Sequence, residues 1–431
     1  MDAGSIPAAS ILYTSEAMLL NKNSLFRLSP LLLLIFIDSF SFFVVIPVLL
    51  KIFYHNHYAL LPSTTPISER NTLTGIVISL SMFSALFSAP IVGKASDQYG
   101  RKKTLLFCIG CISLGFLFPI IGIMQKNIYL IFIGRIISGI GSASQPIAQA
   151  AVADVCQRED KAVFLGSIAL MMTLALILGP LAGGVLSNTQ LFHWLNSKTP
   201  FEFALMLSMI NLLLILFFFT ETAKINQQSK LVSLCEVIIG LPRLIRSYQL
   251  GGLMLLFFCL ELGWSQYYQS ISLFLHLKSH FSVEKISLFG ANMGIVMVIG
   301  LLILYPLLLR IFSVKNIMRY NVMLVFFGLS ACALFPLSTI QWIFSALVAL
   351  STGMAYVSLV TLISNQVAVN EQGLAMGYLS AILYFAWMAT AFCSGFLISL
   401  YIVLPLYVAA LFLLVPGCLV FFNFRANQQR Y

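Results

Sequence analysis

Three ionisable side chains stand inside long apolar stretches of the sequence. They are Asp38, Arg135 and Glu261. Charged groups are destabilising in hydrocarbon, and in membrane proteins they mark the paths of ions and substrates. Loss of water favours a protonated carboxyl, whereas a nearby cation favours the carboxylate. A carboxyl whose distance from Arg135 changes between two conformations can therefore take up a proton on one side of a membrane and release it on the other.

Each of these residues also has a purely structural interpretation. Asp38 and Arg135 could form a static buried pair, and Glu261 could lie near water or pair with Gln266. We predict the functional role for all three, either in proton coupling or in binding a cationic substrate. Asp38 and Glu261 should then face the protein interior and not the lipid.

Aromatic and hydroxyl side chains follow Glu261 at steps of three and four residues. These are Trp264, Ser265, Tyr268 and Ser272. Residues at this spacing share one face of a helix. The face offers an acid and several aromatic planes, which suit a bulky, partly cationic molecule.

A second motif combines glycines with charges, in the run Gly93-Lys-Ala-Ser-Asp97-Gln-Tyr-Gly100-Arg101-Lys-Lys. Gly93 and Gly100 permit a tight turn and a close approach of helices. Asp97 is placed to face the N-terminus of a neighbouring helix, whose partial positive charge stabilises a carboxylate. An Asp97–Arg101 ion pair could then latch one conformation. The alternative is that the cations only fix membrane orientation, which explains neither the glycines nor the acid.

The composition defines the class of protein that must position these groups. Of the 431 residues, 60% are hydrophobic and only 9% are charged. Soluble domains carry roughly a quarter charged residues, so we predict a polytopic membrane protein. The net charge of +10 reflects basic residues in short loops, which indicates orientation and not nucleic-acid binding.

We find no nucleophile–base pair, metal-ligand cluster or phosphate-binding glycine loop, and we expect no enzyme activity, cofactor, metal site or disulfide.

Apolar stretches long enough to cross a bilayer predict an all-α fold with twelve transmembrane helices. The predicted spans are 30–52, 73–92, 104–124, 128–151, 164–187, 203–220, 250–275, 288–309, 320–338, 341–364, 376–399 and 402–423. With both termini in the cytoplasm, 17 of the 24 Lys and Arg residues lie on the cytoplasmic side, 6 on the other side and one, Arg135, within a span. This excess of positive charge determines the predicted orientation.

The longest cytoplasmic loop, 221–249, divides the chain into two six-helix bundles, 30–220 and 250–423. An acid and a glycine recur at equal spacing before spans five and eleven, as Asp160 with Gly166 and Glu371 with Gly377, which supports an internal repeat.

The two ends of the chain are predicted to be cytoplasmic tails, 1–29 and 424–431. We also hypothesise that residues 1–17 are a start-site artefact and that Met18 is the true start. The reason is that Gly4-Ser-Ile-Pro7 is what the T-arm of a transfer-RNA gene would encode.

Four motifs in order resemble the major facilitator superfamily, and within it the twelve-span drug:proton antiporters of the tetracycline-efflux branch. Besides the motif at 93–103, they are Asp38 with Pro47 in span one, Gly134-Arg135-Ile-Ile-Ser-Gly139-Ile-Gly141 in span four, and Gly179-Pro180-Leu-Ala-Gly183-Gly184 in span five. The resemblance implies a cytoplasmic latch at the first of these and an antiporter signature at the last. It also implies a cavity lined by spans one, four, seven and ten, for which we predict Gln145, Trp264, Tyr268 and Tyr356.

The resemblance implies a proton-coupled efflux antiporter for an amphipathic, drug-like compound. Its partners would be protons, a small-molecule substrate and the lipid of a bacterial inner membrane, and it would act as a monomer. Acids that some tetracycline exporters carry in spans three and nine are absent, which argues against tetracycline itself. Two alternatives stay open: proton-coupled import or export of a metabolite such as a siderophore, and a non-transporting receptor with the same fold.

Overall fold

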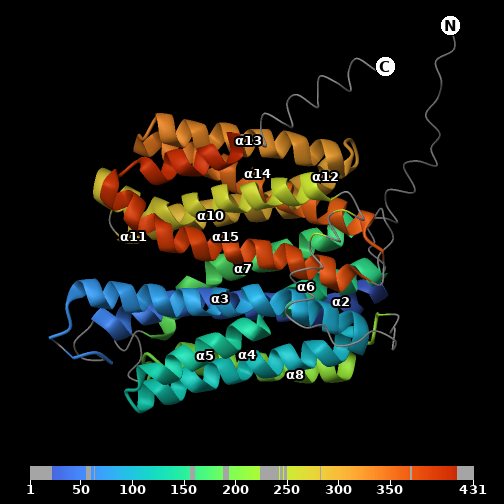
Figure 1. The fold of residues 1–431 in the computed structure, drawn as a ribbon, viewed down its shortest axis with the longest axis horizontal. Helices are drawn as coiled ribbons and strands as arrows, with labels where there is room; N and C mark the ends of the chain where they lie inside the picture. Colours follow the sequence, from blue (N-terminus) through green and yellow to red (C-terminus); the bar gives the residue numbers. More distant parts are fainter. Residues whose placement is uncertain are drawn as a thin grey trace, which may run out of the picture.

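The computed structural model is an all-α bundle of long helices that run side by side (Figure 1). It describes residues 22–54, 60–62, 64–155, 161–187, 194–223, 242, 246, 250–281, 283–368 and 371–414. No strand occurs in this part of the chain. The predictions for the first 21 residues, for most of the 221–249 loop and for the C-terminal tail lie outside the described residues.

In chain order the helices lie before or after residues 221–249, and we call these two groups the N-terminal half and the C-terminal half. The N-terminal half contains α2 (Lys22–Tyr54), α3 (Ile67–Tyr99), α4 (Arg101–Met124), α5 (Ile128–Gly141), α6 (Ser144–Val155), α7 (Lys161–Leu186) and α8 (Thr199–Phe218). The C-terminal half contains α10 (Gly251–Ser279), α11 (Val283–Ile299), a π-helical turn η1 (Gly300–Leu304), α12 (Tyr305–Leu309), α13 (Val314–Leu334), α14 (Ser338–Gln366), α15 (Gln372–Leu400) and a last helix at Leu404–Leu414.

Every predicted span overlaps a helix, although the twelfth is described only as far as Leu414. Eight helices in the described part of the chain are long and apolar enough to cross a membrane. Twelve crossings and cytoplasmic termini stay predictions.

Two predicted spans are interrupted. The span 128–151 is broken at Ser142 and Ala143, between α5 and α6, and the span 288–309 contains the π-helical turn η1. Pro146 explains the first interruption in part, because its nitrogen has no hydrogen to donate to the carbonyl of Ser142. Average hydropathy does not detect these breaks, since each stretch as a whole is still apolar enough to cross a membrane.

The predicted spans 73–92 and 104–124 leave the glycine-and-charge motif in a loop between them; this is wrong, because the motif is helical. Helix α3 continues to Tyr99 and α4 begins at Arg101, so that Gly100 alone connects them. Gly100 has a φ of 95°, a backbone conformation that residues other than glycine rarely adopt. A Cβ atom here would also collide with the carboxylate of Glu221. A single glycine therefore turns the chain between two long helices.

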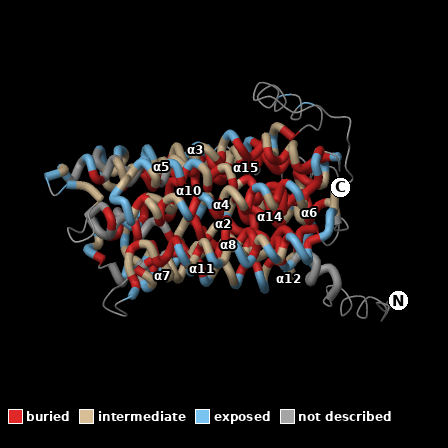
Figure 2. Tube along the Cα trace, turned by 90° about the horizontal axis from the view of Figure 1, so that it is seen from below, coloured by how far each residue is buried: buried red, intermediate tan, exposed pale blue. Residues whose placement is uncertain are grey.

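Two seams join the halves. Helix α15 packs against α3 and α6, and α7 packs against α11 and α14. Figure 1 shows α3 and α15 side by side along the middle of the molecule. Buried residues follow the inner faces of the helices, as Figure 2 shows. Asp38, Arg135 and Glu261 are among these buried residues and therefore lie on the inner faces.

Candidate functional site

The motif at 93–103 holds one end of the α3–α15 seam together. The carboxylate of Asp97 accepts hydrogen bonds from the backbone N–H groups of Gly373 and Leu374, both at 3.0 Å. These groups lie in the first turn of α15, where N–H groups have no partner within the helix. The carboxylate is thus placed at the positive end of the helix dipole. We call this end of the bundle the Asp97 end; the charge distribution predicts that it faces the cytoplasm.

Arg101 connects the same carboxylate to two further acids. Its Nη1 lies 2.7 Å from Oδ1 of Asp97, and its Nε lies 2.9 Å from Oδ2 of Asp154 at the end of α6. Glu221 accepts hydrogen bonds from the backbone N–H groups of Arg101 and Lys102, at 2.8 and 3.1 Å. Asp154 and Glu221 were not predicted from the sequence. Each lies more than 50 residues from Arg101, so no local spacing could have identified them.

Glycines bring the two halves into direct backbone contact beside Asp97. A Cβ atom on Gly93 would collide with the carbonyl of Gly373, and one on Gly373 with the carbonyl of Gly93. One turn further, a Cβ on Gly377 would lie 2.7 Å from the carbonyl of Ala89. The glycine of the predicted repeat, Gly377, is therefore part of this contact, and its counterpart Gly166 lies near Tyr305 in the other seam.

The second seam is closed differently at the same end. Lys161, at the start of α7, donates a hydrogen bond of 3.2 Å to the hydroxyl of Ser364 near the end of α14. In the first seam a carboxylate, Asp97, binds the N-terminus of a helix, whereas in the second seam a cation, Lys161, binds a hydroxyl group. This agrees with the sequence of the second half, where the run from Leu309 to Arg319 keeps the cations but has no acid.

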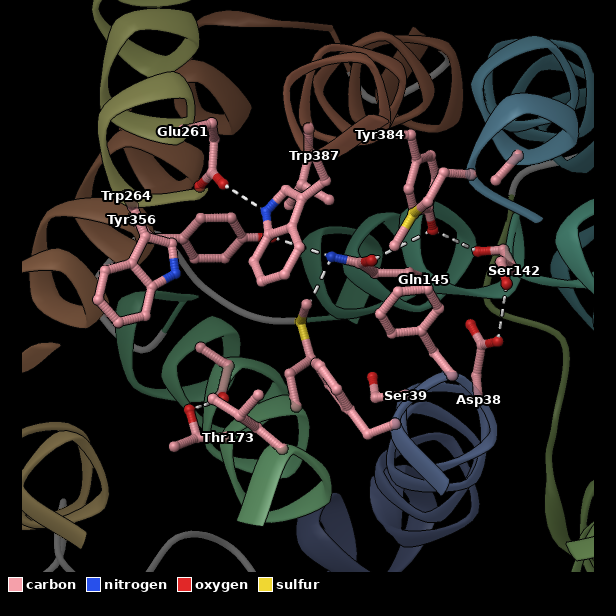
Figure 3. Close-up of a pocket in the computed structure, with 18 of the residues that line it drawn as sticks. Asp38, Ser39, Ser142, Gln145, Thr173, Glu261, Trp264, Tyr356, Tyr384 and Trp387 are labelled. Atoms are coloured by element: carbon pink, nitrogen blue, oxygen red, sulfur yellow. Dashed lines mark hydrogen bonds between the residues drawn. The ribbon is translucent and has the colours of Figure 1, made fainter. Parts of the chain in front are cut away.

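A central cavity of about 140 Å³ lies between the halves. Residues from both halves line it, including Asp38, Phe42, Ser81, Ser142, Gln145, Met172, Thr173, Glu261, Trp264, Thr352, Tyr356, Tyr384 and Trp387. Figure 3 shows the two acids at opposite sides of this group, with Gln145 and Trp387 between them. The structure thus brings Asp38 and Glu261, which lie 223 residues apart in the sequence, to one cavity.

Asp38 is buried and held by two hydroxyl groups. Ser142 and Ser144 donate hydrogen bonds of 3.0 and 2.9 Å to its two carboxylate oxygens. Arg135 is also buried, but its Nη2 lies 2.6 Å from the hydroxyl of Ser81, and its guanidinium lies 5.7 Å from the centre of the Phe42 ring. Among the residues that the structure describes, no salt bridge joins Asp38 and Arg135. The static buried pair considered from the sequence is therefore not the arrangement of this conformation.

Glu261 occupies an aromatic corner of the cavity. Its carboxylate accepts a hydrogen bond of 3.3 Å from the indole of Trp387, whereas Gln266 donates to Ser270 and Ser394. Tyr268 packs behind this corner, with its ring centre 5.6 Å from that of Trp264 and 5.7 Å from that of Trp387. An acid surrounded by aromatic faces is suited to a group that is both apolar and positively charged.

The sequence matches a known family of proteins over most of its length. The family model of the Major Facilitator Superfamily matches residues 31–377. The chain belongs to this superfamily. It is therefore a multi-pass membrane transporter of the major facilitator fold, as the four motifs predicted.

Relatives of this major facilitator protein include drug-resistance proteins at low identity. It is 32% identical to the class H tetracycline resistance protein of Pasteurella multocida over 160 residues, which cover 37% of this chain and 38% of that one. It is 24% identical to multidrug resistance protein 1 of Bacillus subtilis (strain 168) over 312 residues, which cover 71% and 75%. The matches to the tetracycline resistance proteins of classes H and B thus span little more than a third of those proteins.

Solved structures share the fold over nearly the whole chain. The human organic anion transporter MFSD10 superposes with a TM-score of 0.78 at 16% identity, covering 92% of this chain and 99% of that one. The proton:xylose symporter XylE superposes with a TM-score of 0.71 at 12% identity, covering 92% and 95%. At these identities the likeness concerns the fold alone.

The glycine-and-proline motif at 179–184 of this major facilitator protein lies in an uninterrupted part of α7. Helix α7 runs from Lys161 to Leu186 through Gly179, Pro180, Gly183 and Gly184. A Cβ on Gly179 would lie 2.6 Å from the Cβ of Phe43 and 3.2 Å from the nitrogen of Val44, so this glycine lets α7 approach α2 closely. The directional role of the signature stays a proposal.

Three of the four predicted cavity residues line the cavity: Gln145, Trp264 and Tyr356. Tyr268 packs against the indoles behind it. Tyr384 and Trp387 also line the cavity but were not predicted, although their three-residue spacing places both on one face of α15. They belong to predicted span eleven, whereas the resemblance implied spans one, four, seven and ten.

Proposed function

We propose that this transporter is a bacterial inner-membrane antiporter that exports an amphipathic organic compound in exchange for protons, acting as a monomer. The state of Asp38 is the main support. It is a buried acid in the cavity wall, with two hydroxyl partners and no salt bridge to the nearby cation in the described residues. Because a hydroxyl can donate to a carboxylate and accept from a protonated carboxyl, this site can hold Asp38 in either form.

The closed Asp97 end complements this chemistry. The hydrogen bonds of Asp97 and Lys161, and the backbone contact between Gly93 and Gly373, join the halves there. If that end faces the cytoplasm, the conformation is closed to the cytoplasm, and Asp38 would exchange its proton with the opposite side. Opening the Asp97 end would then let it release the proton inside and let substrate enter.

Substrate class and direction rest on different observations. The cavity places Glu261 beside Trp264 and Trp387, among many apolar neighbours, which favours an amphipathic compound with an aromatic or cationic part. The names of the relatives, tetracycline and multidrug resistance proteins, favour export.

The test uses inverted membrane vesicles of a bacterial host that produces the protein. A pH-sensitive dye follows protons while a panel of amphipathic compounds, with tetracycline as one member, is added. We expect an exported compound to release protons from energised vesicles. Asp38→Asn should abolish uphill accumulation while leaving exchange at equal concentrations partly intact. Uphill transport by Asp38→Asn at the normal rate would contradict the proposal, and silence with every compound would favour a receptor.

A further inference from the structure

The break in the helix beside Asp38 leaves a backbone carbonyl that the other half of the protein takes up. In a continuous helix the carbonyl of Ser142 would accept from the N–H of residue 146, which is proline and has none. This carbonyl has a long contact of 3.4 Å with the N–H of Gln145 and a short hydrogen bond of 2.9 Å from the hydroxyl of Tyr384. Tyr384 lies on α15, so a group next to Asp38 is held across the interface between the halves.

The same residue, Ser142, has a hydroxyl with two acceptors in reach. Its Oγ lies 3.0 Å from Oδ1 of Asp38 and 3.3 Å from the carbonyl of Ser138. A hydroxyl carries one proton and a carboxylate is the stronger acceptor, so the bond to Asp38 is favoured while Asp38 is ionised. Protonation removes that advantage, and the hydroxyl can then turn to Ser138. The carbonyl and hydroxyl of one residue thus contact Tyr384 and Asp38 respectively, as Figure 3 shows.

We infer that Tyr384 is a positioning residue for Asp38. Tyr384 holds the Ser142 carbonyl from the opposite half of the protein. It thereby keeps the segment Ser142–Ser144 in the position where the hydroxyls of Ser142 and Ser144 bind the Asp38 carboxylate. Protonation of Asp38 loosens this segment and with it the contact between the halves. This inference rests on the proposed role of Asp38 as the proton carrier. It adds the contacts through which protonation of Asp38 would lead to opening of the Asp97 end.

Other groups also act on Asp38, and a test has to separate them from Tyr384. In the part of the chain that the structure describes, the charged and titratable groups that interact with its carboxyl are Arg135 on α5, Cys108 on α4 and Tyr384 on α15. Arg135 and Cys108 belong to the N-terminal half, so Tyr384 is the member of this set that reaches across the interface.

Two substitutions remove the Tyr384 contact in different ways. Tyr384→Phe deletes the hydroxyl. Pro146→Ala leaves Tyr384 intact but supplies the missing N–H, which competes for the Ser142 carbonyl. Tyr356→Phe is the matched control: Tyr356 is also buried and crosses the interface, with hydrogen bonds of 3.0 and 2.9 Å from Gln145 and Gln149, but it has no bond to Ser142. If Tyr384→Phe fails to fold, Pro146→Ala carries the test.

The experiment needs no substrate. The full chain is reconstituted in lipid and titrated with acid. Infrared difference spectra follow protonation of Asp38 through the carboxyl band that Asp38→Asn lacks, and hydrogen–deuterium exchange of peptides covering 93–103 and 371–380 follows opening of the Asp97 end. In the wild type, we expect exchange to change over the same pH interval as the Asp38 band. In Tyr384→Phe and Pro146→Ala, the amplitude of that change should fall at least fivefold while Asp38 still titrates, and Tyr356→Phe should keep it.

The outcomes separate the inference from the proposed function. Wild-type amplitude in Tyr384→Phe or Pro146→Ala, an equal loss in Tyr356→Phe, or no pH-dependent exchange in the wild type would overturn the role of Tyr384. If Asp38→Asn keeps the full pH-dependent change in exchange, Asp38 is not the proton carrier, and the proposed function fails with it.

Discussion

The Asp97 carboxylate and the backbone N–H of Gly373 are 276 residues apart in the chain and form a hydrogen bond of 3.0 Å. This bond joins the end of α3 to the start of α15 and so links the two halves of the transporter. It also explains why the motif at 93–103 contains both an acid and glycines. The acid stabilises the N-terminus of α15, and the glycines let that N-terminus come close enough.

Asp97→Asn should slow transport without weakening substrate binding. The amide keeps the shape of the side chain but loses the charge that interacts with the α15 N-terminus and with Arg101. A charge at a helix terminus contributes about 1 kcal/mol, and more where it is buried, so we expect turnover to fall roughly 5- to 30-fold with KM unchanged. Initial rates of export measure both constants. Lys103→Gln, which removes an exposed charge nearby, is the control, and a pure rise in KM for Asp97→Asn would contradict the latch.

Gly373→Ala should prevent the halves from closing at the Asp97 end. The added Cβ would meet the carbonyl of Gly93 and the Asp97 and Arg101 side chains, and the backbone cannot move away without separating α3 from α15. We expect transport to fall more than tenfold with normal amounts of protein in the membrane. Gly110→Ala is the matched control, because nothing lies within 4 Å of a Cβ built there. Equal activity of the two variants would show that this contact is dispensable.

Asp154→Asn should destabilise the protein more than loss of an exposed acid. Asp154 and Arg101 form a buried ion pair of 2.9 Å, and removal of one partner from such a pair costs about 3–5 kcal/mol. Glu202→Gln breaks the exposed pair with Lys198, at 3.1 Å, and should cost about 0–1 kcal/mol. Thermal unfolding of both variants in the same lipid or detergent measures the difference. Similar melting temperatures would mean that Asp97 alone is enough to hold Arg101.

Arg135→Ala should move the pH profile of transport toward higher pH. The guanidinium interacts electrostatically with Asp38, and a nearby cation favours the ionised carboxyl, so its removal should let Asp38 keep its proton at higher pH. Transport rates measured across a pH series give the profile. Ser81→Ala, which removes the hydroxyl that binds Arg135 at 2.6 Å but keeps the charge, should shift the profile less. A profile that does not move would exclude Arg135 from proton coupling.

Much of the fold could be predicted because hydropathy is a local property. A run of apolar residues long enough to cross a bilayer must satisfy its own backbone, and a helix does so within the run, so each predicted span overlaps a helix. The breaks inside the spans were not predicted. At Ser142 the helix stops because Pro146 lacks a donor, and the hydroxyl of Tyr384 on α15 binds the Ser142 carbonyl that the break sets free.

The sequence alone determined that the chain is helical, that it lies in a membrane, and that Asp38, Arg135 and Glu261 are unusual, because these conclusions depend on which residue types occur within one span. Tertiary structure decided the partners of these residues: Ser142 and Ser144 for Asp38, Ser81 for Arg135, and Trp387 for Glu261. It also gave Arg101 a second acid, Asp154, in addition to Asp97. Most of these contacts join helices that are far apart in the chain. Their register depends on how side chains and glycines pack between helices, which no spacing along one helix specifies.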